Sequence, residues 1–138
     1  MFTNTLRENA EHLLIHCRRV SLKISTAESC TGGLIASCIT ACKGSSSVFE
    51  RGYITYSNEA KEELLNVSPK TLQSFGAVSA EVAIEMAEGA LTNAKTDLAL
   101  AVTGVAGPGG GTSLKPVGLV FIACACLLYT SPSPRDTA

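Results

Sequence analysis

The strongest candidate nucleophile in this sequence is Ser29, which lies in a turn between an expected strand and an expected helix. Gly32 and Gly33 follow it, and apolar residues at helical spacing resume immediately afterwards. A serine in such a turn can expose its hydroxyl, and amides at the start of the helix can donate to a developing oxyanion. The spacing differs from the G-x-S-x-G motif. The alternative therefore stays open that Ser29, Thr31 or both only cap the helix.

Tyr56 and Lys61 form a second candidate group. Tyr56 ends a stretch rich in aromatic and β-branched residues, and Lys61 lies in the first turns of the next expected helix. A cation is electrostatically unfavourable near a helix N-terminus, so this position of Lys61 indicates a functional use. A lysine that desolvation makes neutral can accept a proton from a serine. The alternative is a solvated surface lysine. Arg51 and Tyr53 are weaker candidates on the same expected strand.

The third group is the glycine-rich segment 103–111. Its glycines let the backbone approach a ligand closely and turn amides inward, which suits a phosphate or an acyl oxygen. Neither the G-K-[ST] ending of a Walker loop nor the G-x-G-x-x-G dinucleotide pattern is present. The alternative is a plain flexible connection. All three groups follow expected strands, and in an open α/β sheet the carboxyl ends of the strands converge on one crevice.

The elements that position these groups alternate along the chain. Apolar spacing and start signals predict five helices, over 6–19, 34–42, from 57 onward, from 69 to the stop at Gly76, and over 79–94. Patterns typical of β structure predict four strands, over 22–26, 49–56, 98–102 and 117–126. This order predicts an α/β fold, a three-layer α/β/α sandwich in a single domain.

Local signals refine these elements. Thr5 and Glu8 have the form of a capping box for the first helix, and Ser57 and Ser68 are suited to cap two later helices. Alternation of apolar and polar residues predicts a half-buried strand over 22–26. The continuous apolar run over 98–102 instead predicts a central strand that is covered on both faces.

Length and composition disfavour several classes of protein. The chain has 138 residues, of which 46% are hydrophobic, and a net charge of -1, which predicts a folded domain without affinity for nucleic acid or anionic lipid. The N-terminus lacks an apolar signal-peptide core, and the longest apolar stretch is about half of a membrane span. We therefore expect a cytoplasmic protein with no membrane partner.

The six cysteines are expected to be reduced, because nothing indicates an oxidising compartment. They include no C-x-x-C pair, and His12 and His16 lack the acidic partners of an H-E-x-x-H motif. We expect no metal site. The segment 129–138 has two prolines and no periodicity, which predicts a disordered or non-native tail after a domain over 1–128.

The segment 26–33, read T-A-E-S-C-T-G-G, resembles the CinA C-terminal domain family, the bacterial nicotinamide-nucleotide amidases. Further collinear blocks agree with the family, and the resemblance covers about residues 6–125. These blocks are 44–47, 49–52, 55–61, 76–79, 103–108 and 115–118.

The resemblance implies a three-layer α/β/α fold that hydrolyses the amide of nicotinamide mononucleotide (NMN) to nicotinate mononucleotide and ammonia, without cofactor or metal, in pyridine nucleotide recycling. Ser29 would be the nucleophile, Lys61 its general base, and Tyr56 a hydrogen-bonding partner that relays or orients the proton. Residues assigned to substrate binding, as oxyanion donors or pocket lining, are Cys30, Thr31, Gly32, Gly33, Thr103, Gly104 and Gly107.

The end of the chain departs from the family pattern. Family members continue after the strand of block 115–118 with another strand and a helix, including an arginine assigned to the substrate phosphate. We therefore expect a C-terminally incomplete domain, and transfer no role to Arg135. The alternative function is a catalytically silent nucleotide-binding or regulatory module. The apolar last strand predicts a homo-oligomer.

Overall fold

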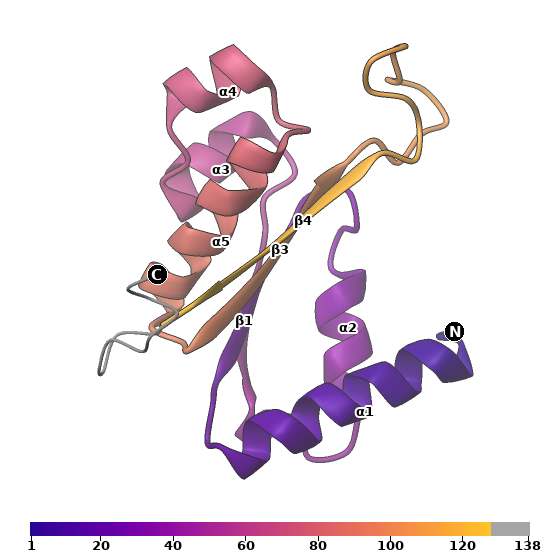
Figure 1. Ribbon diagram of the computed structural model, residues 1–138, viewed down its shortest axis with the longest axis vertical. Coiled ribbons are helices and arrows are strands. Elements are labelled where there is room, and N and C mark those ends of the chain that lie inside the picture. The colour runs from indigo at the N-terminus through magenta and orange to yellow at the C-terminus, as the bar shows by residue number, and fades with distance from the viewer. Residues whose placement is uncertain (128–138) are drawn as a thin grey trace, which may run out of the picture.

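A four-stranded sheet forms the centre of the computed structural model, which describes residues 1–127 (Figure 1). The strands are β1 (Ile24–Glu28), β2 (Phe49–Ile54), β3 (Leu98–Gly104) and β4 (Val120–Cys126). The helices are α1 (Asn4–Arg19), α2 (Leu34–Thr40), α3 (Asn58–Leu65), α4 (Pro69–Phe75) and α5 (Ala80–Ala94), with a 3₁₀ turn η1 (Ser45–Ser47). The tail predicted over 129–138 lies outside the described residues.

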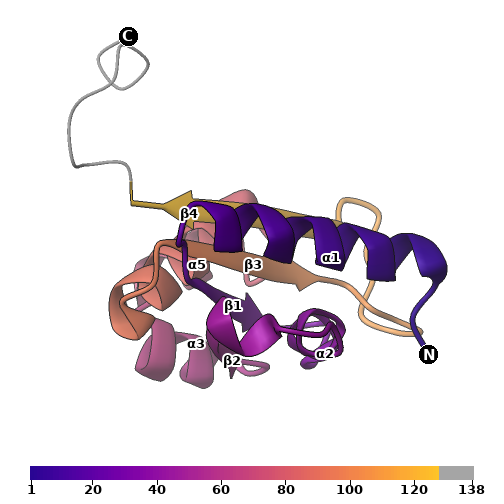
Figure 2. The same ribbon diagram turned by 90° about the horizontal axis from the view of Figure 1, so that it is seen from below.

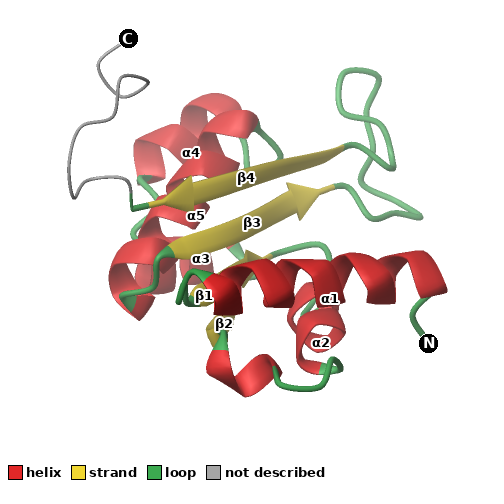
Figure 3. Ribbon diagram, turned by 60° about the horizontal axis from the view of Figure 1, so that its bottom comes forward, coloured by secondary structure: helices red, strands yellow, loops and turns green. Residues whose placement is uncertain are grey.

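The strands are ordered β2-β1-β3-β4. β1 pairs in parallel with both β2 and β3, whereas β4 runs antiparallel to β3, as the opposed arrows of Figure 3 show. β1 and β3 are therefore the inner strands. Because β2 and β3 both run parallel to β1, the carboxyl ends of these three strands lie at the same edge of the sheet. The loop 105–119 leaves from the end of β3 at that edge (Figure 1).

Helices cover both faces of the sheet. α3, α4 and α5 lie on one side, where the core includes Leu65, Met86 and Ala101. α1 and α2 lie side by side on the other (Figure 2), where Leu14, Ile24 and Ile39 pack together. The predicted three-layer α/β fold is confirmed. Within residues 1–127, no helix has both the length and the apolar composition needed to cross a bilayer.

The prediction that the first strand is half-buried is wrong. All five residues of β1 are buried, including Ser25 and Thr26. Helices cover both faces of this inner strand, and Ser25 satisfies its hydroxyl with Thr96 Oγ1 at 2.7 Å. β1 also extends to Glu28, two residues beyond the predicted end, and β4 begins at Val120 rather than Val117.

Side-chain caps define most helix starts. Ser57, Ser68 and Ser79 accept amide hydrogen bonds at the starts of α3, α4 and α5, which confirms these predicted starts. The capping box predicted at Thr5 is wrong. The hydroxyl of Thr3 caps α1 instead, by accepting from the Leu6 amide at 3.2 Å, so the helix begins one residue before Thr5.

α5 passes very close to the end of α3 at Gly89, where a Cβ atom would lie 1.9 Å from the Leu65 carbonyl oxygen. In an ordinary helix, Gly→Ala is stabilising by about 1 kcal/mol. Here we expect Gly89→Ala to lower the free energy of unfolding by about 1–3 kcal/mol, because α3 and α5 must separate. Denaturant unfolding measures the change, with the exposed Glu88→Ala as a control. A more stable Gly89→Ala variant would contradict this close packing.

Candidate active site

A cavity of about 290 Å³ opens at the carboxyl ends of β1, β2 and β3. It brings together residues from all three groups that sequence analysis selected. The lining includes Ser29 and Cys30 after β1, Tyr56 and Lys61 after β2, and Thr103, Gly104 and Gly107 at and after β3. The convergence expected for strand ends therefore places the candidate nucleophile, lysine and glycine-rich loop around one space.

Lys61 and Ser29 are in direct contact at the bottom of this site. Lys61 Nζ donates a hydrogen bond to Ser29 Oγ at 2.9 Å. The same nitrogen donates to the carbonyl oxygens of Thr55 at 2.8 Å and Tyr56 at 3.1 Å. The lysine amine is thus held between one hydroxyl and two main-chain acceptors.

Burial changes the chemistry of Lys61. The residue is 0% exposed, which excludes a solvated surface lysine. Within residues 1–127 the one ion pair joins Arg51 and Glu50, so no carboxylate neutralises the Lys61 amine. Desolvation lowers the pKa of Lys61 from its ordinary value of 10.5, and it outweighs the neighbouring Cys30, which acts in the opposite direction. A neutral amine beside a serine hydroxyl is a general base.

Local sequence explains how Lys61 reaches the core. Ser57 caps α3 and so fixes where the helix begins. Lys61 and Leu65 are four residues apart, hence on one helix face, and both are buried. The Thr55 amide donates to the Glu28 carbonyl at 2.8 Å, which ties the segment before α3 to the end of β1.

The turn that carries Ser29 is organised by Glu28. The Ser29 amide donates to Val102 O at 3.0 Å, and the residue is 7% exposed. The Glu28 carboxylate, itself 1% exposed, accepts from the hydroxyl of Thr31 and from amides at the start of α2. Sequence reasoning did not assign Glu28 a role. The available signal was an acidic residue at the end of a strand, six positions before the first residue of α2.

This capping limits which of the predicted substrate contacts can form. The amide of Gly33 donates to Glu28 Oε1 at 3.2 Å, and that of Gly32 donates to Ser29 O at 3.1 Å. Thr31, Gly32 and Gly33 do not line the cavity, whereas Cys30 does. Of the predicted oxyanion donors, the amides of Cys30 and Thr31 are the two that make no hydrogen bond to an oxygen acceptor in the described part of the chain.

Tyr56 lies at the mouth of the cavity, and its residue is 73% exposed. Its contact with Lys61 is through the main-chain oxygen. Within residues 1–127, its hydroxyl makes no hydrogen bond to Ser29 or Lys61, so its role in proton transfer stays a prediction. The weaker candidates lie elsewhere: Arg51 is exposed and pairs with Glu50, and Tyr53 packs against the core under α5.

The opposite wall of the cavity includes residues that sequence analysis missed. Ala77 and Val78, in the connection between α4 and α5, line it. Thr103 Oγ1 donates to Ala77 O at 2.8 Å and thereby fastens this connection to the end of β3. Gly104 has no room for a side chain, because a Cβ atom would lie 2.6 Å from Leu119 O. The glycine at this position lets β3 and the returning loop pass closely.

Burial raises the pKa of the Cys30 thiol, despite opposing contributions from nearby amides and from Lys61. Across residues 1–127, no three histidine, cysteine or carboxylate side chains gather as metal ligands would.

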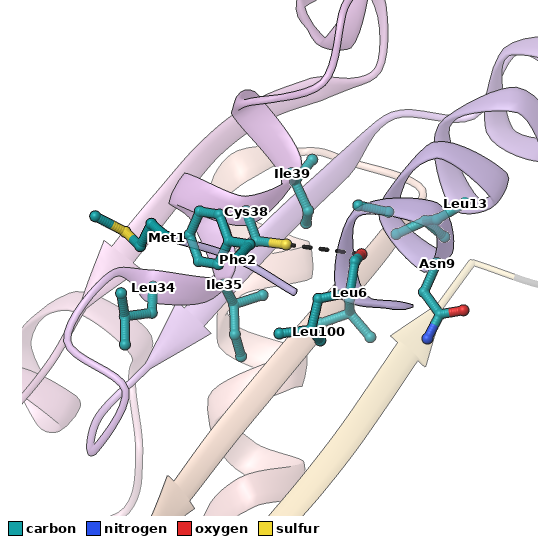
Figure 4. A pocket seen from close by; sticks show the side chains of 11 residues that line it. Met1, Phe2, Leu6, Asn9, Leu13, Leu34, Ile35, Cys38, Ile39 and Leu100 are labelled. Carbon is teal, nitrogen blue, oxygen red and sulfur yellow. Dashed lines mark hydrogen bonds between the residues drawn. The ribbon is translucent and has the colours of Figure 1, made fainter. Parts of the chain in front are cut away.

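A larger apolar cavity, of about 430 Å³, lies between α1, α2 and β3 (Figure 4). Leu6, Ile35 and Leu100 line it, and it holds no charged side chain. Of these two cavities, the one at Ser29 is therefore the one that a charged side chain, Lys61, lines.

The model of the CinA C-terminal domain family matches residues 6–130 of this sequence. The chain belongs to the CinA C-terminal domain family. The crystal structure of the competence/damage inducible protein CihA from Agrobacterium tumefaciens superposes on this CinA C-terminal domain with a TM-score of 0.90 at 48% identity, covering 91% of this chain and 76% of that one. The resemblance inferred from the sequence blocks is confirmed.

Other relatives agree with this assignment. A CinA superfamily protein from Escherichia coli superposes with a TM-score of 0.79 at 31% identity, covering 94% of this chain and 82% of that one. A CinA-like protein of Colwellia psychrerythraea is 54% identical over 114 residues, which are 83% of this chain and 26% of the relative. This CinA C-terminal domain thus spans about 30% or less of the length of such curated relatives.

Proposed function

We propose that this chain hydrolyses the carboxamide of NMN to nicotinate mononucleotide and ammonia. The observation that carries the proposal is the 2.9 Å contact between Lys61 Nζ and Ser29 Oγ, made by a lysine that is 0% exposed and has no carboxylate partner. A serine activated by a buried neutral lysine is suited to attack an amide carbonyl. The resemblance to the nicotinamide-nucleotide amidases supplies both the amide and NMN as the proposed substrate.

The first half of the reaction forms an ester. Neutral Lys61 removes the hydroxyl proton of Ser29 as Oγ attacks the carboxamide carbon. The carbonyl oxygen becomes an oxyanion, for which the Cys30 amide, whose residue lines the cavity, is the available donor in this turn. The proton held by Lys61 passes to the amide nitrogen as the C–N bond breaks. Ammonia leaves, and the nicotinoyl group remains on Ser29 Oγ.

The second half returns the enzyme to its starting state. Lys61, again neutral, removes a proton from a water molecule, which attacks the ester carbon. The bond to Ser29 Oγ breaks, and the serine recovers its proton from Lys61. The sum is one water consumed, one ammonia released and one carboxylic acid formed, and the proton of this acid passes to ammonia in solution to give carboxylate and ammonium. No redox step or external cofactor is needed for this balance.

Ammonia release from NMN tests the proposal, with nicotinate mononucleotide identified as the second product. We expect release in step with product formation, and none from a sample without protein. Calorimetry with NMN measures binding separately. Binding without ammonia release would replace the proposal with the alternative of a catalytically silent nucleotide-binding module, and the absence of both would reject NMN as the ligand.

Tyr56 is proposed to assist proton transfer to the departing ammonia. Tyr56→Phe keeps the ring at the mouth of the cavity and removes the hydroxyl. We expect kcat to fall by about tenfold or more, because general acid assistance contributes about 10²–10⁴-fold in enzymes where it acts. Steady-state kinetics with NMN measures the change, and Tyr53→Phe is a matched control outside the cavity. An unchanged kcat would leave proton delivery to Lys61 alone.

A further inference from the structure

Glu28 is a buried carboxylate that the mechanism above does not use. It is 1% exposed, and the one ion pair within residues 1–127 lies elsewhere, so no cation balances its charge. Its oxygens are instead satisfied by hydrogen bonds. Burying such a charge is costly unless its surroundings supply several donors. The structure supplies four of them, and all belong to the segment that begins two residues after Ser29.

The four donors come from both sides of the Gly32–Gly33 turn. Oε1 accepts from Thr31 Oγ1 at 2.6 Å, from the Gly33 amide at 3.2 Å and from the Ile35 amide at 3.0 Å. Oε2 accepts from the Ala36 amide at 2.9 Å. In this turn Gly32 and Gly33 adopt φ values of +59° and +106°, in the left-handed region that favours glycine. The Glu28 side chain therefore ties both sides of this turn together, in addition to the main-chain hydrogen bonds from the Gly32 amide to Ser29 O at 3.1 Å and from the Leu34 amide to Thr31 O at 3.0 Å.

The main chain of Glu28 reaches the second half of the catalytic pair. Its carbonyl oxygen accepts from the Thr55 amide at 2.8 Å, and the Thr55 carbonyl accepts from Lys61 Nζ at 2.8 Å. Residue 28 is thus bonded to the turn that follows Ser29 and to a residue that holds Lys61. A shift of about 1 Å between reacting groups costs about 10²-fold in rate, so this connection bears on catalysis.

We propose that Glu28 is a positioning residue of the active site, whose carboxylate clamps the Ser29 turn so that Ser29 Oγ stays in contact with Lys61 Nζ. The inference rests on the proposed function in that it takes Ser29 as the nucleophile. It goes beyond that function by assigning the precision of the Ser29–Lys61 contact to a residue that touches neither the substrate nor the reacting atoms.

Glu28→Gln tests the clamp with little change in shape. The glutamine side-chain oxygen takes the place of one carboxylate oxygen. The side-chain NH₂ group takes the place of the other and faces a main-chain N–H. Because NH₂ is not an acceptor, that hydrogen bond is lost. We expect kcat for NMN to fall by about ten- to hundredfold with KM nearly unchanged, because positioning rather than binding is lost. Glu28→Ala should lose more activity, and if it fails to fold, Glu28→Gln still decides the question.

Glu85→Gln is the matched control. Glu85 also accepts at the start of a helix, from the Ser68 amide at 2.8 Å and from Thr71 Oγ1 at 2.6 Å, but it caps α4 and does not line the cavity. A residue with a merely structural role would behave as Glu85 does, losing stability without changing kcat. Equal kcat values in Glu28→Gln and Glu85→Gln, measured on folded protein, would overturn the proposal.

A second readout separates this inference from the choice of substrate. Phenylmethylsulfonyl fluoride forms a bond between sulfur and an activated serine oxygen as fluoride leaves, and mass spectrometry locates the label. We expect wild-type Ser29 to be labelled and Glu28→Gln to react about ten- to hundredfold more slowly, with Glu85→Gln at the wild-type rate. If Ser29 is labelled but no ammonia is released from NMN, the proposed NMN hydrolysis is rejected and the positioning role of Glu28 is not. A wild-type Ser29 that resists labelling, or equal rates in all three proteins, would overturn the positioning role.

Discussion

Ser29→Ala is expected to reduce ammonia release from NMN by about 10³-fold or more while the fold is retained. The substitution removes the atom that forms the ester, and loss of a serine nucleophile is among the most damaging changes an enzyme of this type can suffer. Ser29 Oγ has a single described partner, Lys61 Nζ at 2.9 Å. Removing this oxygen therefore disturbs few other contacts, and far-UV circular dichroism should stay unchanged.

The control for this experiment is Ser37→Ala, which removes an exposed hydroxyl on α2. It should keep wild-type kcat and KM. Retained NMN binding by Ser29→Ala, measured by calorimetry, would show that the loss is in chemistry rather than in folding or affinity. If Ser29→Ala still released ammonia at a rate close to wild type, the serine ester mechanism would be rejected.

Lys61→Met is expected to have the second-largest effect, a fall in kcat of about 10²–10⁴-fold, because it removes the general base and retains a side chain of similar length. In the wild type, only the neutral amine can accept the serine proton. Activity should therefore rise with pH through the lowered pKa of Lys61 and be lost below it. Lys70→Met, at an exposed position on α4, is the matched control and should keep the wild-type rate and pH profile.

The same lysine predicts a pH dependence of stability. The folded-state pKa of Lys61 is lowered from 10.5 by desolvation, so between the lowered value and 10.5 the unfolded chain holds a proton that the folded chain has released. The free energy of unfolding should rise with pH across this window. Lys61→Met lacks this contribution, so the stability of the wild type relative to Lys61→Met should increase with pH. Denaturant unfolding at several pH values measures it, and a constant difference would show that Lys61 is not desolvated.

Much of the site could be predicted because strand ends converge. Ser29, Lys61 and Thr103 each follow a strand pattern that can be identified from spacing, and a parallel sheet brings such positions to one edge. The burial of Lys61 could not be predicted in this way. It depends on how α3 docks against α5, and that docking is set by the close approach of Gly89 to Leu65, residues far apart in the sequence.

The parts of the prediction that the structure altered share one physical cause. Ser25 and Thr26 are polar, so alternation predicted a strand with one solvated face, yet both are buried, and Ser25 bonds to Thr96 from a distant part of the chain. In the same way, the amides that α2 would offer to a substrate are satisfied by the Glu28 carboxylate. Sequence patterns identify polar groups but do not show which partner will satisfy them.

Two of the three acceptors around Lys61 Nζ are main-chain oxygens, and this affects how the site tolerates mutation. When Lys61 loses its third proton, its two remaining N–H groups stay directed at the carbonyls of Thr55 and Tyr56. The lone pair then takes the direction of Ser29 Oγ, and the serine hydroxyl becomes the donor in that contact. Every amino acid carries a carbonyl oxygen. Side-chain replacements at positions 55 and 56 that preserve the backbone path should therefore leave the base correctly oriented, unlike a catalytic triad, whose orienting carboxylate a single codon change removes.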